Sequence, residues 1–367
     1  MFLCLTKKFH LKESFLPSSS HQYDIEADWS LLRTCNFRCD YCYFDDQERS
    51  VKIKTHASPE QWAEGFNKTG KKWLIHITGG EPTLYPDFVR LCDELTKKHF
   101  ISINSNLSNK CIEEFAGKVN PAKINFINAA LHLHEREKRN QLEPFIARAK
   151  LLQNQGFPLL VSAVMNPQMV ASIEDTASQF GKRGLFVIPK VMRGAYKGKN
   201  YPNDYTPQEK EIIKKHLEAA RAHYRVLLEH MPELPTADMF SDEKFLEGIP
   251  DYRTKPCSAG FKFVAITANG TVLRCGSSEV FGNILHHNLK LRQAPSLCNT
   301  HYCPYFCEKY TQDAQTYLLA HHNASLASNS PIKEYMTGPA KFIYYSLKSG
   351  ESAGNLLKKI SKKILAR

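Results

Sequence analysis

The stretch RTCNFRCDYCYFD, residues 33–45, holds three of the 11 cysteines of the chain. Cys35, Cys39 and Cys42 are separated by three and then two residues. Thiolates are soft ligands that suit iron–sulfur clusters and zinc. Structural zinc sites usually close on four protein ligands, whereas three thiolates on a four-iron cube leave one iron open. The spacing therefore favours an open iron–sulfur cluster, with a zinc site completed by a distant fourth ligand as the alternative.

A second motif follows in WLIHITGGEPTLYPDF, which begins at Trp73. Its run LIHIT is short and rich in β-branched residues, as in a buried parallel strand. The GGEPT turn after it contains glycines, which allow a backbone to approach a ligand closely. The carboxylate of Glu81 could pair with an ammonium group.

Together the two motifs resemble those of the radical S-adenosylmethionine (radical SAM) superfamily. The cluster motif of that family, Cys-x3-Cys-x-aromatic-Cys, is matched by Cys35, Cys39, Tyr41 and Cys42. Its GGEP motif is matched by Gly79, Gly80, Glu81 and Pro82.

The resemblance implies a [4Fe–4S] cluster on the three cysteines, with S-adenosylmethionine on the open iron. The GGE segment would hold the methionine amino group, and Tyr41 would lie beside the adenine. One electron from the reduced cluster would cleave the sulfonium, and the resulting 5′-deoxyadenosyl radical would abstract hydrogen from a substrate. An electron donor such as flavodoxin or ferredoxin is then needed.

The rest of the first half alternates predicted strands with predicted helices. The strands are expected at 25–32, 73–78, 100–106, 124–134, 158–165 and 185–192, and the helices at 59–70, 86–99, 110–118, 143–156 and 171–184. This alternation predicts a parallel α/β sheet with right-handed crossovers. It agrees with the partial (β/α)6 TIM barrel of the family, in which ligands gather at the carboxyl ends of the strands.

Polar residues near these strand ends are candidate site residues. Ser105 and Asn106 resemble part of a Thr-Asn-Gly segment of the family, although Leu107 replaces the glycine, and Asn166 follows the fifth strand. All three are expected near the cofactor.

Further candidates follow the fourth and sixth strands. Alternation along 124–134 points His132 and His134 into the barrel, where either could accept a substrate proton or simply form a buried hydrogen bond. The last strand is followed by a basic loop that could meet an anionic substrate or stay solvated, with Lys190, Arg193, Lys197 and Lys199.

A second cysteine group lies in the last third of the chain: Cys257, Cys275, Cys298, Cys303 and Cys307. Residues 262–275 read as a β-hairpin. The spacing of Cys257, Gly270 and Cys275 resembles the SPASM or twitch auxiliary-cluster domains of radical SAM enzymes. We expect one auxiliary [4Fe–4S] cluster on Cys257 and Cys275 plus two of the other three, preferably Cys303 and Cys307. A zinc ion is the alternative. Cys298 could instead replace one of these ligands or transfer a proton or hydrogen atom.

The predicted organisation has four parts. An N-terminal extension covers 1–26, the barrel with its following helix 27–235, the auxiliary domain 236–312, and a helical segment 313–367. Leu356, Leu357, Ile360 and Ile364 form an apolar stripe among lysines. Such a helix can lie on a membrane, but packing on its own domain is the more usual arrangement and is favoured here.

Composition limits the class of protein. The formal net charge is +12, but the basic residues are spread along the chain, so nucleic acid is not an expected partner. An iron–sulfur redox sensor that binds nucleic acid would need a recognition helix or basic arm, and neither is evident. No signal peptide or membrane span is evident, and the cysteine content points to a reducing, cytoplasmic location.

Sequence alone leaves the reaction open. A small polar substrate, such as a sugar, aminocyclitol or nucleotide-linked molecule, is favoured, and the enzyme is expected to be an oxidoreductase. Peptide modification is the alternative. Peptide modifiers often carry a leader-binding domain before the barrel, and the 26 residues expected there are too few for an independent domain.

Overall fold

The structure is a computed structural model that describes residues 22–225, 243–248, 250–275, 279–300 and 307–328. The chain divides into two compact units, Met1–Ala314 and Gln315–Arg367, and the fold and sites below belong to the first. The predicted apolar stripe near the C-terminus, most of the N-terminal extension and Cys303 lie outside the described residues. No helix in the described ranges is long and apolar enough to cross a membrane.

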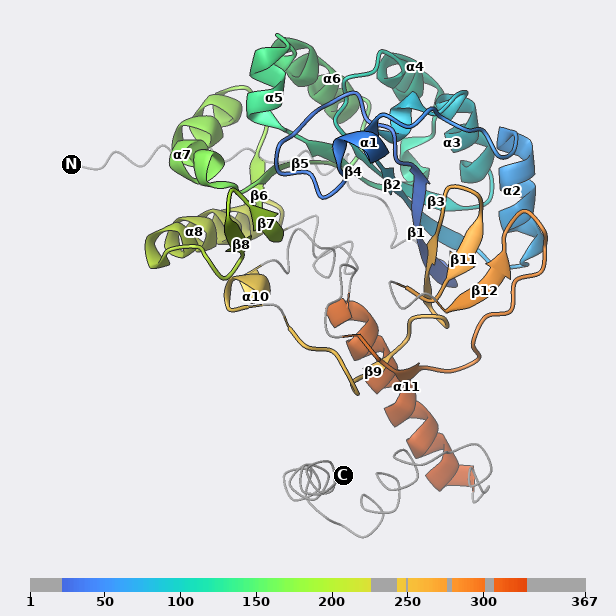
Figure 1. The fold of residues 1–367 in the computed structure, drawn as a ribbon. Coiled ribbons are helices and arrows are strands. Elements are labelled where there is room, and N and C mark those ends of the chain that lie inside the picture. The colour runs from blue at the N-terminus through green and yellow to red at the C-terminus, as the bar shows by residue number, and fades with distance from the viewer. Residues whose placement is uncertain (1–21, 226–242, 249, 276–278, 301–306, 329–367) are drawn as a thin grey trace. The chain divides into compact units, whose positions relative to one another are not determined.

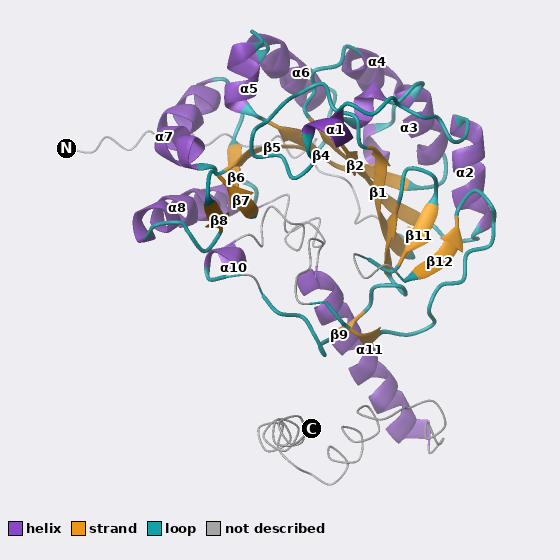
Figure 2. Ribbon diagram, viewed as in Figure 1, coloured by secondary structure: helices purple, strands orange, loops and turns teal. Residues whose placement is uncertain are grey.

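Six parallel strands lie side by side in sequence order (Figure 1). They are β1 (Ile25–Leu32), β2 (Trp73–Gly79), β3 (Phe100–Ser105), β4 (Ile124–Ala130), β5 (Leu159–Val164) and β6 (Val187–Lys190). The connecting helices are α2 (Pro59–Lys68), α3 (Phe88–Thr96), α4 (Cys111–Lys118), α5 (Leu133–Lys138), α6 (Leu142–Asn154) and α7 (Pro167–Lys182), which cover one side of the sheet (Figure 2). The predicted partial TIM barrel is thereby confirmed.

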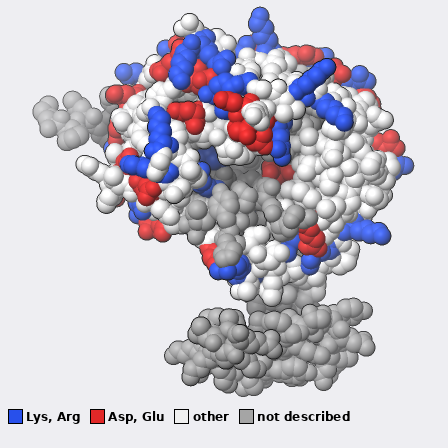
Figure 3. Space-filling view, viewed as in Figure 1, with Lys and Arg blue, Asp and Glu red and all other residues white. Residues whose placement is uncertain are grey.

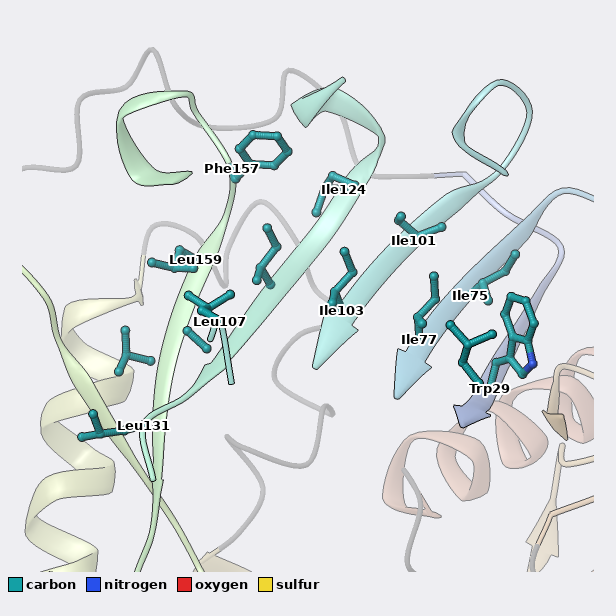
Figure 4. Close-up of a cluster of buried hydrophobic side chains, with 14 of the residues drawn as sticks. Trp29, Ile75, Ile77, Ile101, Ile103, Leu107, Ile124, Leu131, Phe157 and Leu159 are labelled. Carbon is teal, nitrogen blue, oxygen red and sulfur yellow. The ribbon is translucent and has the colours of Figure 1, made fainter. Parts of the chain in front are cut away.

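Alternation along the strands explains this arrangement. Trp29, Ile77 and Ile103 belong to the hydrophobic core, on one face of neighbouring strands (Figure 4). The opposite parity carries polar residues, including Glu26 and His76. One face therefore packs on helices while the other lines the polar interior of the barrel.

The fourth strand is shorter than predicted. It ends at Ala130, and His132 has a left-handed backbone (φ 45°, ψ 48°) at the N-cap of α5. A left-handed residue interrupts the two-residue periodicity of a strand. The expectation that β4 extends through His132 and His134 is therefore wrong, and strand alternation does not set the directions of these two side chains.

The sheet continues beyond β1 into the cysteine-rich part of the chain. Strand β10 (Phe263–Ile266) pairs with β1 in parallel, with Val264 opposite Ala27. The predicted hairpin is confirmed, because β11 (Thr271–Leu273) pairs antiparallel with β10, and β12 (Val280–Asn283) follows. The result is one nine-stranded sheet.

Smaller elements complete the described fold. They are α1 (Asp46–Arg49), two 3-10 turns (Pro82–Leu84 and Pro121–Lys123), the paired strands β7 (Gly194–Tyr196) and β8 (Lys199–Tyr201), α8 (Pro207–His223), α10 (Glu243–Leu246), the paired strands β9 (Pro256–Cys257) and β13 (Ser296–Leu297), and α11 (Cys307–Ser328). Thr206 caps α8, because its side chain accepts a hydrogen bond from the Glu209 N–H at 3.2 Å.

Candidate functional site

The loop after β1 folds around the first cysteine group. The Cys35 N–H donates to the Arg49 carbonyl at 3.0 Å, and the Cys42 N–H donates to the Cys39 carbonyl at 3.2 Å. The buried Arg49 guanidinium returns a bond to the Cys39 carbonyl at 2.8 Å. Arg49 in α1 thus holds the loop closed.

The thiols of this loop lie close enough to influence one another. Burial raises the pKa of Cys35 to about 11 and that of Cys39 to about 12, and neighbouring thiols add to both shifts. A bound metal would replace the protons and stabilise the thiolates. No group of three or more His, Cys, Asp or Glu among the described residues is arranged for a single metal ion. Cysteine thiolates are the ligands that hold iron–sulfur clusters, so the donor chemistry of this loop fits a cluster.

The GGE turn packs directly on this cysteine loop. The Gly80 N–H donates to the Leu32 carbonyl at 2.8 Å, and the Glu81 N–H donates to the Thr34 carbonyl at 2.9 Å. A Cβ on Gly79 would lie 2.1 Å from the Leu32 oxygen, and one on Gly80 would lie 2.2 Å from the Thr34 oxygen. Both glycines are thus required because the backbone of the cysteine loop approaches them closely. The sequence analysis had explained them by the close approach of a ligand.

The Glu81 carboxylate is buried and surrounded by donors. Oε1 accepts from Thr83 Oγ1 at 2.5 Å and from Ser105 Oγ at 2.7 Å, while Oε2 accepts from the Asn106 N–H at 2.7 Å. Burial raises the pKa of Glu81, and these hydrogen bonds oppose the shift. The structure therefore brings Glu81, Ser105 and Asn106 together. Pairing of Glu81 with an ammonium group stays a prediction.

Asn106 also reaches the cysteine loop. Its Nδ2 donates to Asn36 Oδ1 at 3.0 Å, and Asn36 Nδ2 donates to Ser108 Oγ at 2.7 Å. The ends of β2 and β3 therefore both hold the segment that carries the cysteines.

Tyr41 and His132 form a partly buried pair. The Tyr41 hydroxyl lies 2.8 Å from His132 Nδ1, and the two rings stack with centroids 6.0 Å apart. Burial, together with the positive charge of Arg136, lowers the pKa of His132 to about 3. The imidazole is therefore neutral, and its tautomer decides whether Nδ1 accepts a hydrogen bond from the Tyr41 hydroxyl or donates one to it. His134 lies on α5 instead, with Nδ1 3.4 Å from Glu137 Oε2.

Sequence reasoning missed Arg136, which is fully buried beside this pair. Its guanidinium donates to the carbonyls of Leu131, Asn106 and Ala130. It packs 4.0 Å from the Phe145 ring centroid, and its Nη1 has no hydrogen-bond partner within the described chain. A buried positive charge here is suited to anionic thiolates. No motif marked it.

A cavity of about 320 Å³ opens beside the cysteine loop. Its lining comes from that loop, α5 and α7: Cys39, Asp40, Tyr41, His134, Glu135, Lys138 and Gln168. The Tyr196 hydroxyl on β7 donates to Asp40 Oδ2 at 2.9 Å and to Gln168 Oε1 at 3.2 Å. The β7–β8 hairpin thus supports this cavity.

The other predicted side chains are dispersed. Lys197 lies 3.7 Å from Asp40, Arg193 packs on the Phe245 ring at 3.6 Å, and Lys199 is exposed on β8. Lys190 ends β6 and is half-buried. Asn166 caps α7 by accepting from the Met169 N–H at 2.8 Å, so its side-chain oxygen already has a structural role.

The second cysteine group forms a separate pocket. Cys257, Cys275 and Cys298 line it together with Arg274 and Tyr310. Burial raises the pKa of Cys257, and the two neighbouring thiols raise it further. Cys298 is tied to the loop before β9, because the Cys298 N–H donates to the Lys255 carbonyl at 2.9 Å.

This arrangement bears on the predicted ligand preference. The sequence interpretation preferred Cys303 and Cys307 as the completing ligands, but the structure groups Cys298 with Cys257 and Cys275. Cys307 begins α11, and its side chain lies outside what the structure describes. The three grouped thiols have the donor chemistry of a cluster or zinc site.

Acidic and basic side chains are interspersed on the face that carries α1 and α5 (Figure 3). This view shows no single basic surface of the kind that tracks a nucleic-acid backbone.

Comparison with known proteins gives a family match and distant relatives. Residues 29–180 match the radical SAM superfamily. A protein named probable GTP 3',8-cyclase from Metallosphaera sedula is 28% identical over 43% of this chain and 53% of its own length. One with the same name from Sulfurisphaera tokodaii is 21% identical over 67% of this chain and 79% of its own length. The chain thus spans about half of the first relative.

A solved structure described as anSMEcpe with bound AdoMet has a similar fold. Its TM-score is 0.50 at 14% identity, over 81% of this chain and 97% of that one. At this identity the likeness concerns the fold alone.

Proposed function

Because residues 29–180 match the radical SAM superfamily, we propose that this chain is an enzyme that binds a [4Fe–4S] cluster and S-adenosylmethionine. Cys35, Cys39 and Cys42 would hold the cluster. The observation that carries the proposal is the close packing of the GGE turn on the cysteine loop, since it joins the two motifs into one site.

When bound, the cluster and cofactor supply reductive cleavage of the sulfonium to a 5′-deoxyadenosyl radical. The residues of the chain orient and shield that chemistry. His132 holds the ring of Tyr41 in one orientation beside the cavity, which we assign to the nucleoside part of the cofactor. Arg136 supplies a buried positive charge next to Glu81 and Cys39. Glu81, Ser105 and Asn106 would form the polar end of the site.

The second cysteine pocket would hold one auxiliary [4Fe–4S] cluster. Cys257, Cys275 and Cys298 supply three thiolates, and the fourth would come from Cys303 or Cys307. Arg274 lies in the pocket wall, where its charge favours thiolates.

For the substrate, we favour a small polar molecule of the nucleotide class. The support comes from the names of the two relatives and from Lys190, the last residue of β6. A cyclase would rearrange its substrate without net oxidation, so rearrangement takes precedence over the oxidoreductase expectation. Lys190 at the end of β6 is the first candidate for a phosphate contact.

The test of the radical site is the variant with Cys35, Cys39 and Cys42 all changed to alanine. Anaerobic incubation with dithionite and S-adenosylmethionine should give 5′-deoxyadenosine with the parent and none with the variant. Iron should fall by about four atoms per chain. Continued 5′-deoxyadenosine formation by the variant would refute the assignment.

Cys298→Ala tests the second pocket in the same way. Iron should again fall by about four atoms per chain, with the first cluster retained. Cys92→Ala is the matched control, since Cys92 is buried in α3. Unchanged iron in Cys298→Ala would return the ligand role to Cys303 and Cys307.

Substrate class is tested with deuterated candidates. Deuterium should pass into 5′-deoxyadenosine from a nucleoside triphosphate. Transfer from a peptide, and from no nucleotide or sugar, would overturn the substrate proposal in favour of peptide modification.

A further inference from the structure

Glu26 lies on the polar side of β1, nine residues before Cys35 and 231 residues before Cys257, and is almost fully buried. Its side chain meets three partners from outside the sheet. The Lys309 ammonium and the Tyr310 hydroxyl both donate to its carboxylate, and Tyr23 donates to Oε1 at 2.5 Å. Lys309 also donates to the Tyr23 hydroxyl at 3.1 Å.

The carboxylate also meets the interior of the barrel. Glu26 Oε2 lies 3.3 Å from His76 Nε2 on β2, and His76 Nδ1 lies 2.5 Å from Ser102 Oγ on β3. A hydrogen-bonded row therefore runs across three neighbouring strands. It holds Glu26 in one orientation from the barrel side.

Lys309 and Tyr310 belong to the first turn of α11, which begins at Cys307. Tyr310 stacks on Phe263 of β10 at 4.6 Å, and its carbonyl accepts from the Ser258 N–H at 3.0 Å, next to Cys257. Tyr310 also lines the pocket of Cys257, Cys275 and Cys298. The hydroxyl of this wall residue is the group that Glu26 holds.

We propose that Glu26 is a positioning residue for the second cysteine pocket, acting through Tyr310 and Lys309. The inference rests on the metal centre proposed for that pocket. A buried carboxylate that is ion-paired and hydrogen-bonded fixes the start of α11 against β1. It thereby sets the position of one pocket wall and of the helix end that carries Cys307. Outer-sphere groups of this kind orient ligands and tune the metal.

The test uses the full chain with Cys35, Cys39 and Cys42 changed to alanine, so that only the second centre contributes metal and spectrum. Into this background are placed Glu26→Gln, Tyr310→Phe and the control Glu143→Gln. Glu143 is an exposed carboxylate paired with Arg183 at 2.6 Å, so it reports the same charge change on the surface. Tyr310→Phe keeps the Glu26–Lys309 ion pair and removes only the hydroxyl.

The probe is iron and sulfide alone, added anaerobically, with iron and zinc contents, the electron paramagnetic resonance spectrum and the midpoint potential as readouts. In Glu26→Gln we expect roughly tenfold faster metal loss to a chelator and a more positive midpoint potential. Tyr310→Phe should alter the resonance spectrum with smaller metal loss, and it carries the test if Glu26→Gln does not fold.

The inference is overturned if both variants match Glu143→Gln in metal retention, spectrum and potential. Zinc in place of iron in the background protein would refute the auxiliary cluster but not the role of Glu26. That role is then tested by how fast each variant loses zinc to the chelator. A background protein that retains no metal would overturn both.

Discussion

Glu81 lies beside the first cysteine group and Glu26 beside the wall of the second. Both carboxylates are buried, but different groups compensate their negative charge. Glu81 accepts from hydroxyls and a backbone N–H, and its pKa is raised by burial. Glu26 is paired with Lys309, and its pKa is lowered despite its burial. The first region is held by close backbone packing, whereas the second depends on a long-range ion pair. A steric clash should therefore destabilise the first region, whereas protonation of a carboxylate should destabilise the second.

The largest expected effect is on the first region, through Gly80→Ala. The new Cβ would lie 2.2 Å from the Thr34 oxygen and 2.3 Å from the Arg33 oxygen. Both are backbone atoms that cannot turn away, so we expect a loss of roughly 3 kcal/mol in the free energy of unfolding. Urea unfolding measures this loss. The first cluster should also be lost, because the GGE turn no longer packs on the cysteine loop.

Gly117→Ala is the matched control for that substitution. A Cβ at this position in α4 meets nothing within 4 Å, so alanine should stabilise the chain by about 0.5–1 kcal/mol. Equal effects of the two substitutions would show that the packing between the GGE turn and the cysteine loop does not limit stability.

A smaller effect is expected from the pH dependence of the second region. The pKa of Glu26 is lowered from its ordinary value of 4.5, mainly by Lys309 acting against burial, with His76 contributing. Its stabilisation is therefore present above about pH 5 and is lost as the pH falls below that value. Between about pH 6 and about pH 3, the wild type should lose about 2 kcal/mol more than Glu26→Gln.

Glu81 works in the opposite direction, because a raised carboxyl pKa makes stability fall as the pH rises. Glu81 is present in both the wild type and Glu26→Gln, so its effect cancels when the two pH curves are subtracted. Tyr23, Tyr310 and Asp313 also face the Glu26 carboxylate or its lysine. Parallel pH curves for the wild type and Glu26→Gln would contradict an ionised Glu26.

The smallest predicted effect is Tyr41→Phe, which removes the hydrogen bond to His132 within the first region. It should cost about 1 kcal/mol in the free energy of unfolding, since a partly buried hydrogen bond is lost. Tyr43→Phe in the same loop is the control, because that ring is 81% exposed and should change stability little. Unfolding in urea compares the two, and equal losses would remove any special role for the Tyr41–His132 pair.

The sequence by itself determined the barrel and its first cysteine site. Local periodicity marked the strands, and a contiguous motif placed Cys35, Cys39 and Cys42 on one loop. The end of β4 was misplaced because alternation continues through LHLH, while the left-handed His132 is a backbone state that hydrophobic pattern does not encode.

Only the tertiary structure decided which distant groups meet. The pairing of β10 with β1, the grouping of Cys298 with Cys257 and Cys275, and the contact of Glu26 with Lys309 join segments far apart in the chain. Burial raises the pKa of a carboxyl group, and the partners that the fold brings to it decide whether the net shift is upward, as at Glu81, or downward, as at Glu26. A glutamate in a strand sequence carries no mark of that partner, so its ionisation follows from the fold.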